Sequence, residues 1–304
     1  MQSKSKVAAA LCALLLLVLV SSPAMAGNNH FVALTWNVRG NTSPLQPHTP
    51  RNLSAVKSQL VNFQNWFRAS GYPINVYAFQ EIYESQAYEL AQALGIPRSN
   101  VYFFGTKPNY PIAFGNAMMT PLLNVVSAGR EGRSIDYLYQ TTMDFNKSHE
   151  FNLLGGMTVL LPTGQKMRVY DTHLVGDNSV ADQAANNAVY AWKQFADAAR
   201  IIDNNGLSYP SIMMGDFNVH PPTSSYRPAY TQLNYLGMIW LQFRDLWAEW
   251  APSHGNPNEM TEPGLGKRID YVVTRGPRVS PLALNVPDTG AASDHRPMIA
   301  HLTF

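Results

Sequence analysis

The stretch "MMGDFNVHPP" (residues 213–222) joins what resembles a buried strand to a polar turn. Its first residues are apolar, as in a strand of a protein core, whereas the Gly, Asp, Asn and Pro that follow are turn formers. Asp216 and Asn218 thus offer a carboxylate and an amide where a strand leaves the core. Both are hard oxygen groups of the kind that hold divalent cations.

Other predicted strands end in the same way. Polar residues, mostly acidic or histidine, mark five strand ends at Asn37, Glu81, Asp171 with His173, Asp216 with Asn218, and Asp294 with His295, and a sixth, Asp270, lies within the predicted strand "RIDYVV". Each of these residues taken alone fits a turn or a solvated loop. If all of them were unrelated turn residues, their shared placement at strand ends would be a coincidence repeated many times. We therefore expect the strand ends to converge on one rim of a sheet, where open α/β folds bind ligands.

The remaining chain alternates helical and strand-like segments. Apolar spacing predicts helices over 52–69, 85–95 and 180–203, the first capped by Asn52 or Ser54, and a partly helical segment over 231–250. Strand-like runs are 30–38, 74–81, 100–105, 115–129, 133–145, 209–218, 267–276 and 293–304, and 155–174 resembles a hairpin. Hairpins mixed with helices, without repeats or linkers, favour an α/β sandwich with a mixed sheet core.

The first 26 residues have the composition of a signal peptide. Lys4 and Lys6 precede an apolar run over 7–20, and Ala24-Met25-Ala26 is a small-residue cleavage pattern. The run is short of the ~20 apolar residues that span a bilayer, so we expect cleavage instead of anchoring. We therefore divide the chain into a signal peptide, 1–26, and a single catalytic domain, 27–304, that is secreted or periplasmic.

Charge and cysteine content narrow the function classes. Lys4 and Lys6 are the only charged residues of the leader, so the 22 basic and 20 acidic residues of the chain leave residues 27–304 formally neutral. This balance argues against a strongly basic nucleic-acid-binding surface and is compatible with a local basic patch. The single cysteine, Cys12, lies in the leader, so no disulfide stabilises the expected domain.

The motifs "TWNVRG", "FQE", "DTHL", "GDFN", "RIDYV" and "SDHRP", in this order, resemble those of the endonuclease/exonuclease/phosphatase superfamily. The matching segments span residues 31–304. The resemblance implies a four-layer α/β sandwich of the deoxyribonuclease I type, with two mixed β-sheets packed face to face and helices outside. It also implies an exported, bacterial-type member that hydrolyses phosphoric esters with Mg²⁺ or Mn²⁺ by in-line attack of water.

The same resemblance assigns roles to residues. It implies metal binding by Asn37, Glu81 and Asp294. It implies catalytic roles for His173, Asp216, Asn218, Asp270 and His295, with Asp270 orienting His295. It implies contacts to the substrate phosphate from Arg39, Asn218 and His295. Whether Asp216 or a histidine is the general base is left open by the motifs.

The substrate is only weakly indicated. Arg39 resembles a backbone-contacting arginine of deoxyribonuclease-like members, and Arg130, Arg133, Lys267 and Arg268 could form a basic edge. We therefore expect a nuclease acting on nucleic acid as a monomer, since nothing indicates a protein partner. The alternatives are a sphingomyelinase or a phosphoinositide or phosphomonoester phosphatase of the same fold, acting on phospholipid or phosphoinositide. A catalytically inactive binding module is the alternative of another class.

Overall fold

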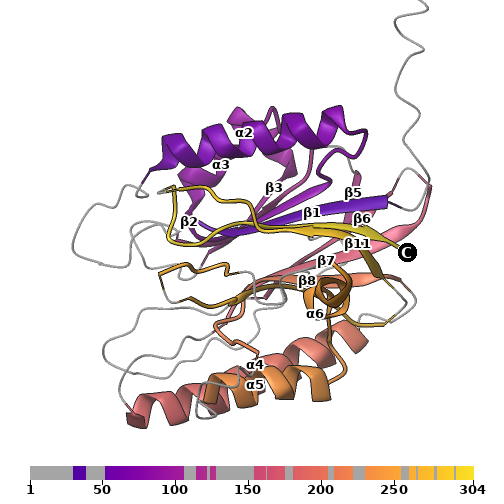
Figure 1. The fold of residues 1–304 in the computed structure, drawn as a ribbon. Coiled ribbons are helices and arrows are strands. Elements are labelled where there is room, and N and C mark those ends of the chain that lie inside the picture. The colour runs from indigo at the N-terminus through magenta and orange to yellow at the C-terminus, as the bar shows by residue number, and fades with distance from the viewer. Residues whose placement is uncertain are drawn as a thin grey trace, which may run out of the picture.

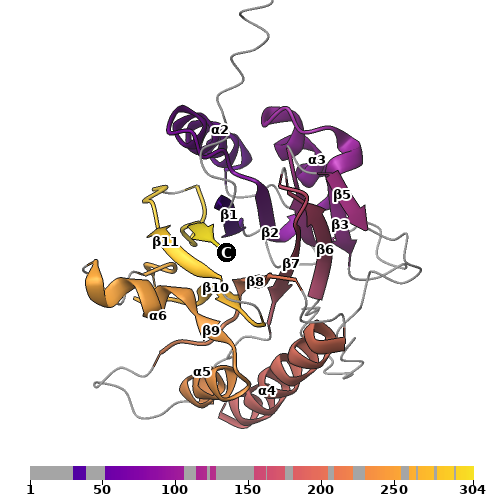
Figure 2. The ribbon, with the colours of Figure 1, turned by 90° about the vertical axis from the view of Figure 1, so that its right-hand side faces the viewer.

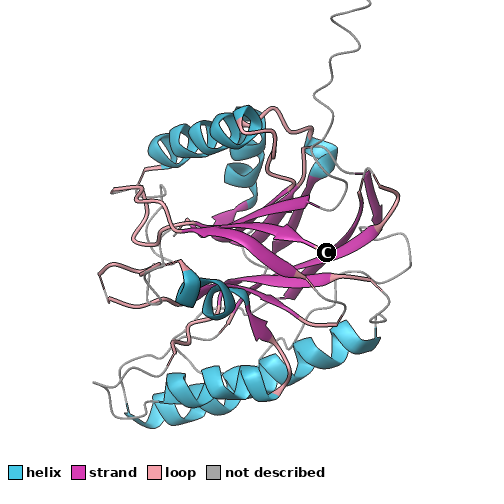
Figure 3. Cartoon of the chain, turned by 45° about the vertical axis from the view of Figure 1, so that its right-hand side comes forward, coloured by secondary structure: helices cyan, strands magenta, loops and turns pink. Residues whose placement is uncertain are grey.

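Two six-stranded sheets face each other between outer helices, which gives four layers (Figures 1 and 3). A computed structural model describes residues 30–38, 52–105, 114–121, 124–127, 154–161, 163–174, 181–204, 209–221, 230–254, 260–264, 266–276, 279–290 and 292–304. Both sheets mix parallel and antiparallel strands. The predicted four-layer α/β sandwich is confirmed. The expected signal peptide and Arg39 lie outside the described residues.

Each sheet is built from strands that are distant in the sequence. The first sheet has the order β11 (Ser280–Asn285), β12 (Met298–Thr303), β1 (His30–Asn37), β2 (Val76–Tyr83), β4 (Phe114–Met119) and β3 (Val101–Gly105). The second has the order β5 (Asn124–Ser127), β6 (Leu154–Leu160), β7 (Lys166–His173), β8 (Ser211–Asp216), β10 (Asp270–Thr274) and β9 (Arg244–Asp245).

Helices cover the outer face of each sheet and one open edge. The first sheet carries α2 (Leu53–Ala69) and α3 (Glu84–Ala93), and the second carries α4 (Ala181–Asn204) and α5 (Tyr230–Trp240). The short helix α6 (Leu246–Trp250) lies beside β11, where Leu246 and Trp247 enter the core between the sheets (Figure 2). Two 3₁₀ turns are η1 (Arg98–Asn100) and η2 (Ala251–Ser253). No helix of the described residues is long and apolar enough to cross a membrane.

Most predicted elements are present among the described residues, with two differences. Of the two residues predicted to cap α2, Asn52 is the N-cap, and its Oδ1 accepts a hydrogen bond from Ala55 N at 2.9 Å. The run over 115–129 divides between β4 in the first sheet and β5 in the second, because local pattern does not specify strand partners. The strands β9 and β11 were not predicted, and the strand predicted over 133–145 lies outside the described residues.

The aromatic side chains of the 231–250 segment do not share one environment, as core packing along a single helix would require. Phe243 and Trp247 are buried, whereas Trp240 is 80% exposed. The segment is broken between α5 and α6 by β9, and Gln242 has a positive φ of 64° at that break. Trp240 is therefore a surface residue, although its spacing from Phe243 and Trp247 is helical.

Each sheet contains one βαβ unit, and these two units determine where the site forms. Parallel strands β1 and β2 are joined through α2, and parallel strands β7 and β8 are joined through α4. In both units the parallel strands end at the same edge of their sheet, as βαβ connections require. The carboxyl ends of the two units carry Asn37, Glu81, His173 and Asp216.

Side-chain alternation then explains why these residues face one another. On the face between the sheets, β1 presents Phe31 and Ala33, and β7 presents Met167 and Val169. Because alternate residues share a face, the next positions on that face are Thr35 and Asn37 in β1, and Asp171 and His173 in β7. The core between the sheets is therefore apolar along most of its length and becomes polar at one end.

Gly215, directly before Asp216, is expected to tolerate no side chain. Its φ is 139°, and a Cβ at this position would lie 1.8 Å from the carbonyl oxygen of Thr172 in the neighbouring strand. We predict that Gly215→Ala lowers the free energy of unfolding by about 3 kcal/mol or more, from steric overlap plus backbone strain. The measurement is chemical denaturation. Gly164→Ala is the control, because Gly164 has a φ of 79° and open space around it, so only strain of ~1–2 kcal/mol is expected.

A histidine pair at the opposite end of β1 predicts a pH dependence. His30 Nδ1 lies 2.8 Å from His301 Nε2, and both rings contact Tyr72. One of the two nitrogens must accept, so the pair cannot bind protons at both. Burial, and then the neighbouring His30, lower the pKa of His301.

Since the unfolded chain binds this proton more readily, stability is retained above about pH 6.5 and is lost as pH falls below it. We predict that His301→Gln removes this part of the slope of unfolding free energy against pH, at most ~1.4 kcal/mol per pH unit. The control is His254→Ala, which removes an exposed histidine that is not part of the pair. A slope identical in wild type and His301→Gln would contradict the assignment.

Candidate active site

The carboxylate of Asp216 is the centre of the polar end of the core. Its Oδ2 accepts a hydrogen bond from Asn37 Nδ2 at 3.0 Å and lies 3.6 Å from His173 Nε2 and 3.7 Å from His295 Nε2. Its Oδ1 accepts the backbone N–H of Asn218 at 2.9 Å. Burial raises the pKa of Asp216, although the two imidazoles favour the ionised form. Burial therefore suits this carboxylate to accepting a proton.

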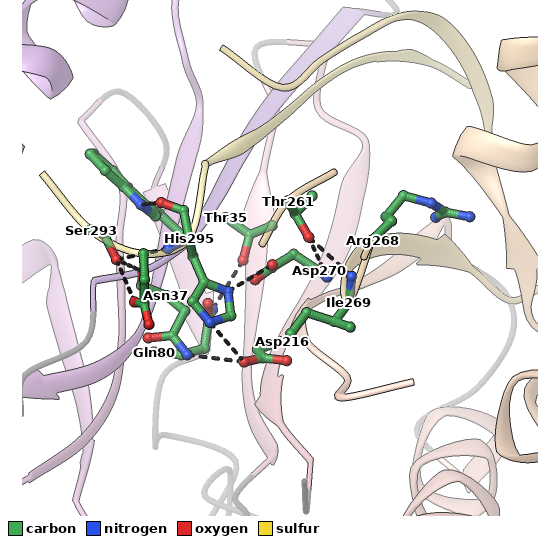
Figure 4. A network of polar contacts seen from close by, with 12 residues as sticks. Thr35, Asn37, Gln80, Asp216, Thr261, Arg268, Ile269, Asp270, Ser293 and His295 are labelled. Carbon is green, nitrogen blue, oxygen red and sulfur yellow. Dashed lines mark hydrogen bonds and ion pairs between the residues drawn. The ribbon is translucent and has the colours of Figure 1, made fainter. Parts of the chain in front are cut away.

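His295 lies between two carboxylates (Figure 4). Its Nδ1 is 2.9 Å from Asp270 Oδ2, and its Nε2 faces Asp216. Burial alone lowers the pKa of His295, but the charges of Asp270 and Asp216 outweigh burial and raise it to about 10. In this arrangement His295 is an imidazolium at neutral pH. The predicted orientation of His295 by Asp270 matches this geometry.

Glu81 reaches the site because its strand is irregular. The pairing of β2 with β4 shifts register between Phe79 and Ile82, and Glu81 has a φ of 53° at this bulge. A bulge with a left-handed residue turns a side chain out of its ordinary alternation. Here it brings Glu81 Oε1 to 3.0 Å from Asn37 Nδ2 and 4.0 Å from His173 Nε2.

The donor set around Glu81 fits a divalent cation. Glu81 Oε2 is buried and has no hydrogen-bond partner among the described residues. Asp216 and Asp270 are also buried, and their carboxylates form, with His295, a group of possible metal ligands whose ligand atoms lie within 4.8 Å of one another. Buried carboxylates need a compensating positive charge, and oxygen-rich sites suit Mg²⁺ or Mn²⁺. Glu81 would hold the cation through the unpartnered oxygen.

Two predicted residues take part differently from what the motifs imply. The group that Asn37 turns toward Glu81 and Asp216 is its amide nitrogen, which donates hydrogen bonds and does not bind cations. Asn218, with a φ of 51°, donates from its side-chain amide to Leu174 O at 2.9 Å, which ties the turn after β8 to the end of β7. Their roles as metal ligand and phosphate contact stay predictions.

Asp294 lies close to a second acidic residue, Glu262, which the sequence analysis did not identify. Ligand atoms of Glu262, Asp294 and His295 all lie within 4.8 Å of one another. Glu262 is outside the named strands, in a single bridge with Lys267, so no strand-end signal marked it. The charge of Glu262 also contributes to the raised pKa of His295. Metal binding by Asp294 stays a prediction.

Backbone positions around the site are fixed by side chains from other segments. Trp36 Nε1 donates to His295 O at 2.9 Å, and Ser293 Oγ donates to Asn37 O at 2.8 Å. Thr261 Oγ1 accepts the backbone N–H groups of Ile269 and Asp270 at 3.0 Å each (Figure 4). These bonds hold the end of β1, the start of β10 and the segment before β12 in one arrangement.

Arg268, one of the residues expected to form a basic edge, is buried in an ion pair. The Arg268 side chain is 2% exposed, and its NH1 and NH2 bind the two carboxylate oxygens of Asp245 at 3.1 and 2.7 Å. Asp245 in turn caps α6 through Trp247 N and Ala248 N. Arg268 is therefore a structural residue and not part of a substrate surface. Arg130 and Arg133 lie outside the described residues.

Comparisons with solved structures agree with this architecture. The humanized D. rerio TDP2 carrying 14 mutations matches with a TM-score of 0.61 at 16% identity, over 90% of this chain and 99% of that one. An endonuclease/exonuclease/phosphatase from Beutenbergia cavernae DSM 12333 gives 0.60 at 21% identity, over 91% and 72%. The human Nocturnin catalytic domain with bound sulfate gives 0.59 at 15% identity, over 92% and 96%.

At these identities the solved structures show the fold alone. The comparison with curated proteins finds no match. The sequence itself matches the Endonuclease/Exonuclease/phosphatase family over residues 34–295, which includes the whole cluster from Asn37 to His295. The chain therefore belongs to the endonuclease/exonuclease/phosphatase family, as a hydrolase of the phosphodiesterase or phosphatase type.

Proposed function

We propose that the chain is an exported, divalent-metal-dependent phosphodiesterase that hydrolyses nucleic acid in the manner of deoxyribonuclease I. The observation that carries this proposal is the placement of Asp216 within 4 Å of two imidazoles, beside a carboxylate with an unpartnered oxygen. An inactive binding module would have no reason to retain all of these groups. Export is proposed from the leader sequence, 1–26.

The residues have separate tasks in the proposed reaction. Asp216 accepts a proton from the attacking water as the new O–P bond forms, which suits a carboxyl whose pKa burial has raised. The His295 imidazolium, held by Asp270, donates a hydrogen bond to a non-bridging oxygen. His173 protonates the leaving oxygen as its bond to phosphorus breaks. A divalent cation bound at Glu81 would supply Lewis-acid stabilisation of the developing negative charge.

Nucleic acid is the substrate class that we favour. A further solved structure with this fold is D. rerio TDP2 complexed with a single-strand DNA product, at 15% identity and a TM-score of 0.61. Arg39, directly after the end of β1, is the residue that we propose for a backbone phosphate contact. Sphingomyelin and phosphoinositides remain the alternative substrates, because the site residues would serve any phosphoric ester.

A substrate panel separates these alternatives. Purified residues 27–304 are given supercoiled plasmid, RNA, sphingomyelin vesicles and a phosphoinositide, each with Mg²⁺ and with Mg²⁺ plus chelator. We expect plasmid nicking that chelator abolishes. Release of choline phosphate or free phosphate with intact plasmid would contradict the nuclease proposal and identify a lipid or phosphatase activity instead.

The two site histidines provide the first prediction on activity. His173→Ala and His295→Ala should each reduce turnover by about 10²–10⁴-fold, because each removes a proton-transfer or hydrogen-bonding group from the transition state. His254→Ala is the matched control, since His254 is exposed and stacks on Trp250. Circular dichroism should be native in all three. Near-full turnover in both site variants would place the chemistry elsewhere.

Metal binding at Glu81 gives a prediction that does not depend on turnover. At a Mg²⁺ concentration about 100 times its Kd, wild type should gain ~2.7 kcal/mol of stability, which thermal unfolding detects. Glu81→Gln should lose this gain, because it replaces the carboxylate by a neutral amide. Glu89→Gln should keep it, since Glu89 lies on α3 and is ion-paired with Lys57 at 2.6 Å. Equal gains in wild type and Glu81→Gln would exclude Glu81 as the ligand.

A further inference from the structure

A second polar layer lies directly beneath the site and joins the two sheets. Gln80 precedes Glu81 in β2 of the first sheet, and Asp171 lies two residues before His173 in β7 of the second. Gln80 Nε2 donates to Asp171 Oδ1 at 2.6 Å and to Thr35 Oγ1 at 3.0 Å. Thr35 lies two residues before Asn37. All three side chains are completely buried, at 0% exposure.

The sequence pattern alone assigned Asp171 to the rim together with His173, and this assignment is wrong. The neighbouring positions on the same face of β7 are Val169, in the apolar core, and His173, in the site. Asp171 is thus enclosed between them. A carboxylate in such a position is costly unless it is neutral or paired with a charge, and Gln80, which donates a hydrogen bond to it, is uncharged.

Two atoms of this pair have no hydrogen-bond partner in the part of the chain that the structure describes: Gln80 Oε1 and Asp171 Oδ2. Both are acceptors when Asp171 is ionised, so neither can satisfy the other. A proton on Asp171 Oδ2 converts it into a donor. The pair could then form two hydrogen bonds, one in each direction, and leave no unsatisfied polar atom.

We propose that Asp171 is a neutral carboxylic acid, and that its link to Gln80 across the sheets positions Glu81 against His173 and Asp216. The inference rests on the proposed function for the metal role of Glu81. Burial, which raises the pKa of the Asp171 carboxyl well above its usual range, supports it against the smaller effects of hydrogen bonds from Gln80 and the Thr172 backbone. Gln80 and Asp171 are positioning residues, since the site residues lie between them and any substrate.

The link adds a polar contact between the two sheets beneath the site. Glu81 and Asp216 belong to different sheets, and the hydrogen bonds that Asn37 donates to their carboxylates are the upper connection. The Gln80–Asp171 bond is a lower connection one residue from Glu81. Two connections at different depths fix both the separation and the relative tilt of the strand ends. Outer-shell partners of this kind typically change metal affinity by 10–100-fold when removed.

Four variants test the link. Asp171→Asn retains an acceptor and a donor, so it imitates the neutral acid. It should keep Mg²⁺ affinity, measured by calorimetric titration, within about threefold of wild type. Asp171→Leu and Gln80→Met each leave the partner unsatisfied, and should lower Tm and weaken Mg²⁺ binding about 10–100-fold.

The fourth variant, Gln80→Met with Asp171→Leu, separates positioning from stability. It removes both polar groups, so Tm should return toward the wild-type value while Mg²⁺ affinity stays weak. Recovery of both quantities would overturn the positioning role, as would an Asp171→Asn variant that binds Mg²⁺ as poorly as Asp171→Leu. Thr274→Val is the control. It removes a buried bond to Ser211 O at the far end of β10, so it should change Tm and not affinity.

An infrared difference spectrum tests the neutral acid without metal or substrate. Wild type minus Asp171→Asn at pH 7 should show the C=O stretch of a protonated carboxylic acid. A carboxylate band instead would overturn the neutral acid. Wild type that binds neither Mg²⁺ nor Mn²⁺ would overturn the proposed metal function and the positioning role with it. The infrared result would still decide the state of Asp171, so the two failures are distinguishable.

Discussion

The contact on which the site depends is the hydrogen bond from Asn37 to Asp216, because it joins the ends of two sheets at a buried carboxylate. Asp216 is 2% exposed and has Asn37, His173 and His295 around one oxygen. Burying a carboxylate is unfavourable unless donors or positive charges surround it. The fold meets this requirement with groups from β1, β7, the turn after β8 and the segment before β12. The same compensation gives the site its proton acceptor and its imidazolium.

The position of this cluster follows from strand direction. Parallel pairs occur once in each sheet as β1–β2 and β7–β8, and all their carboxyl ends meet at one edge of the sandwich. Alternation then assigns the face. The positions that carry apolar residues deeper in the core carry Asn37, His173 and Asp216 at the edge. The departure from alternation is Glu81, which reaches the cluster through a bulge and a left-handed backbone.

Local backbone strain is concentrated at the same place. Three non-glycine residues in the described chain have positive φ, and two of them, Glu81 and Asn218, are site residues. Such conformations cost of order 1 kcal/mol or more and persist where the surroundings over-determine them. The packing around Gly215 restricts the backbone in the same way, because the Thr172 carbonyl oxygen occupies the position that a side chain would take. Glu81, His173 and Asp216 therefore lie at strand ends with restricted backbones, whereas His295 lies in the segment before β12.

Several features were available from the sequence because they are local. Apolar periodicity located α2, α3 and α4, and strand-end polarity selected Asn37, Glu81, His173, Asp216, Asp270 and His295, which the structure brings together. Features that depend on distant partners were not available. The division of 115–129 between two sheets, the pairing of Arg268 with Asp245, and the approach of Glu262 to His295 each involve segments with no shared local pattern.

Asp171 separates what the sequence determines from what only the tertiary structure decides. Its spacing from His173 determined that both side chains share one face of a strand, which is a property of the extended backbone. Whether that face was open or covered at each depth was decided by the opposing sheet. Packing of the first sheet over β7 enclosed Asp171 with Gln80 and left His173 at the edge. Sequence fixes the chemistry that each strand end offers, but only the meeting of two sheets decides which groups face a ligand and which are buried beneath it.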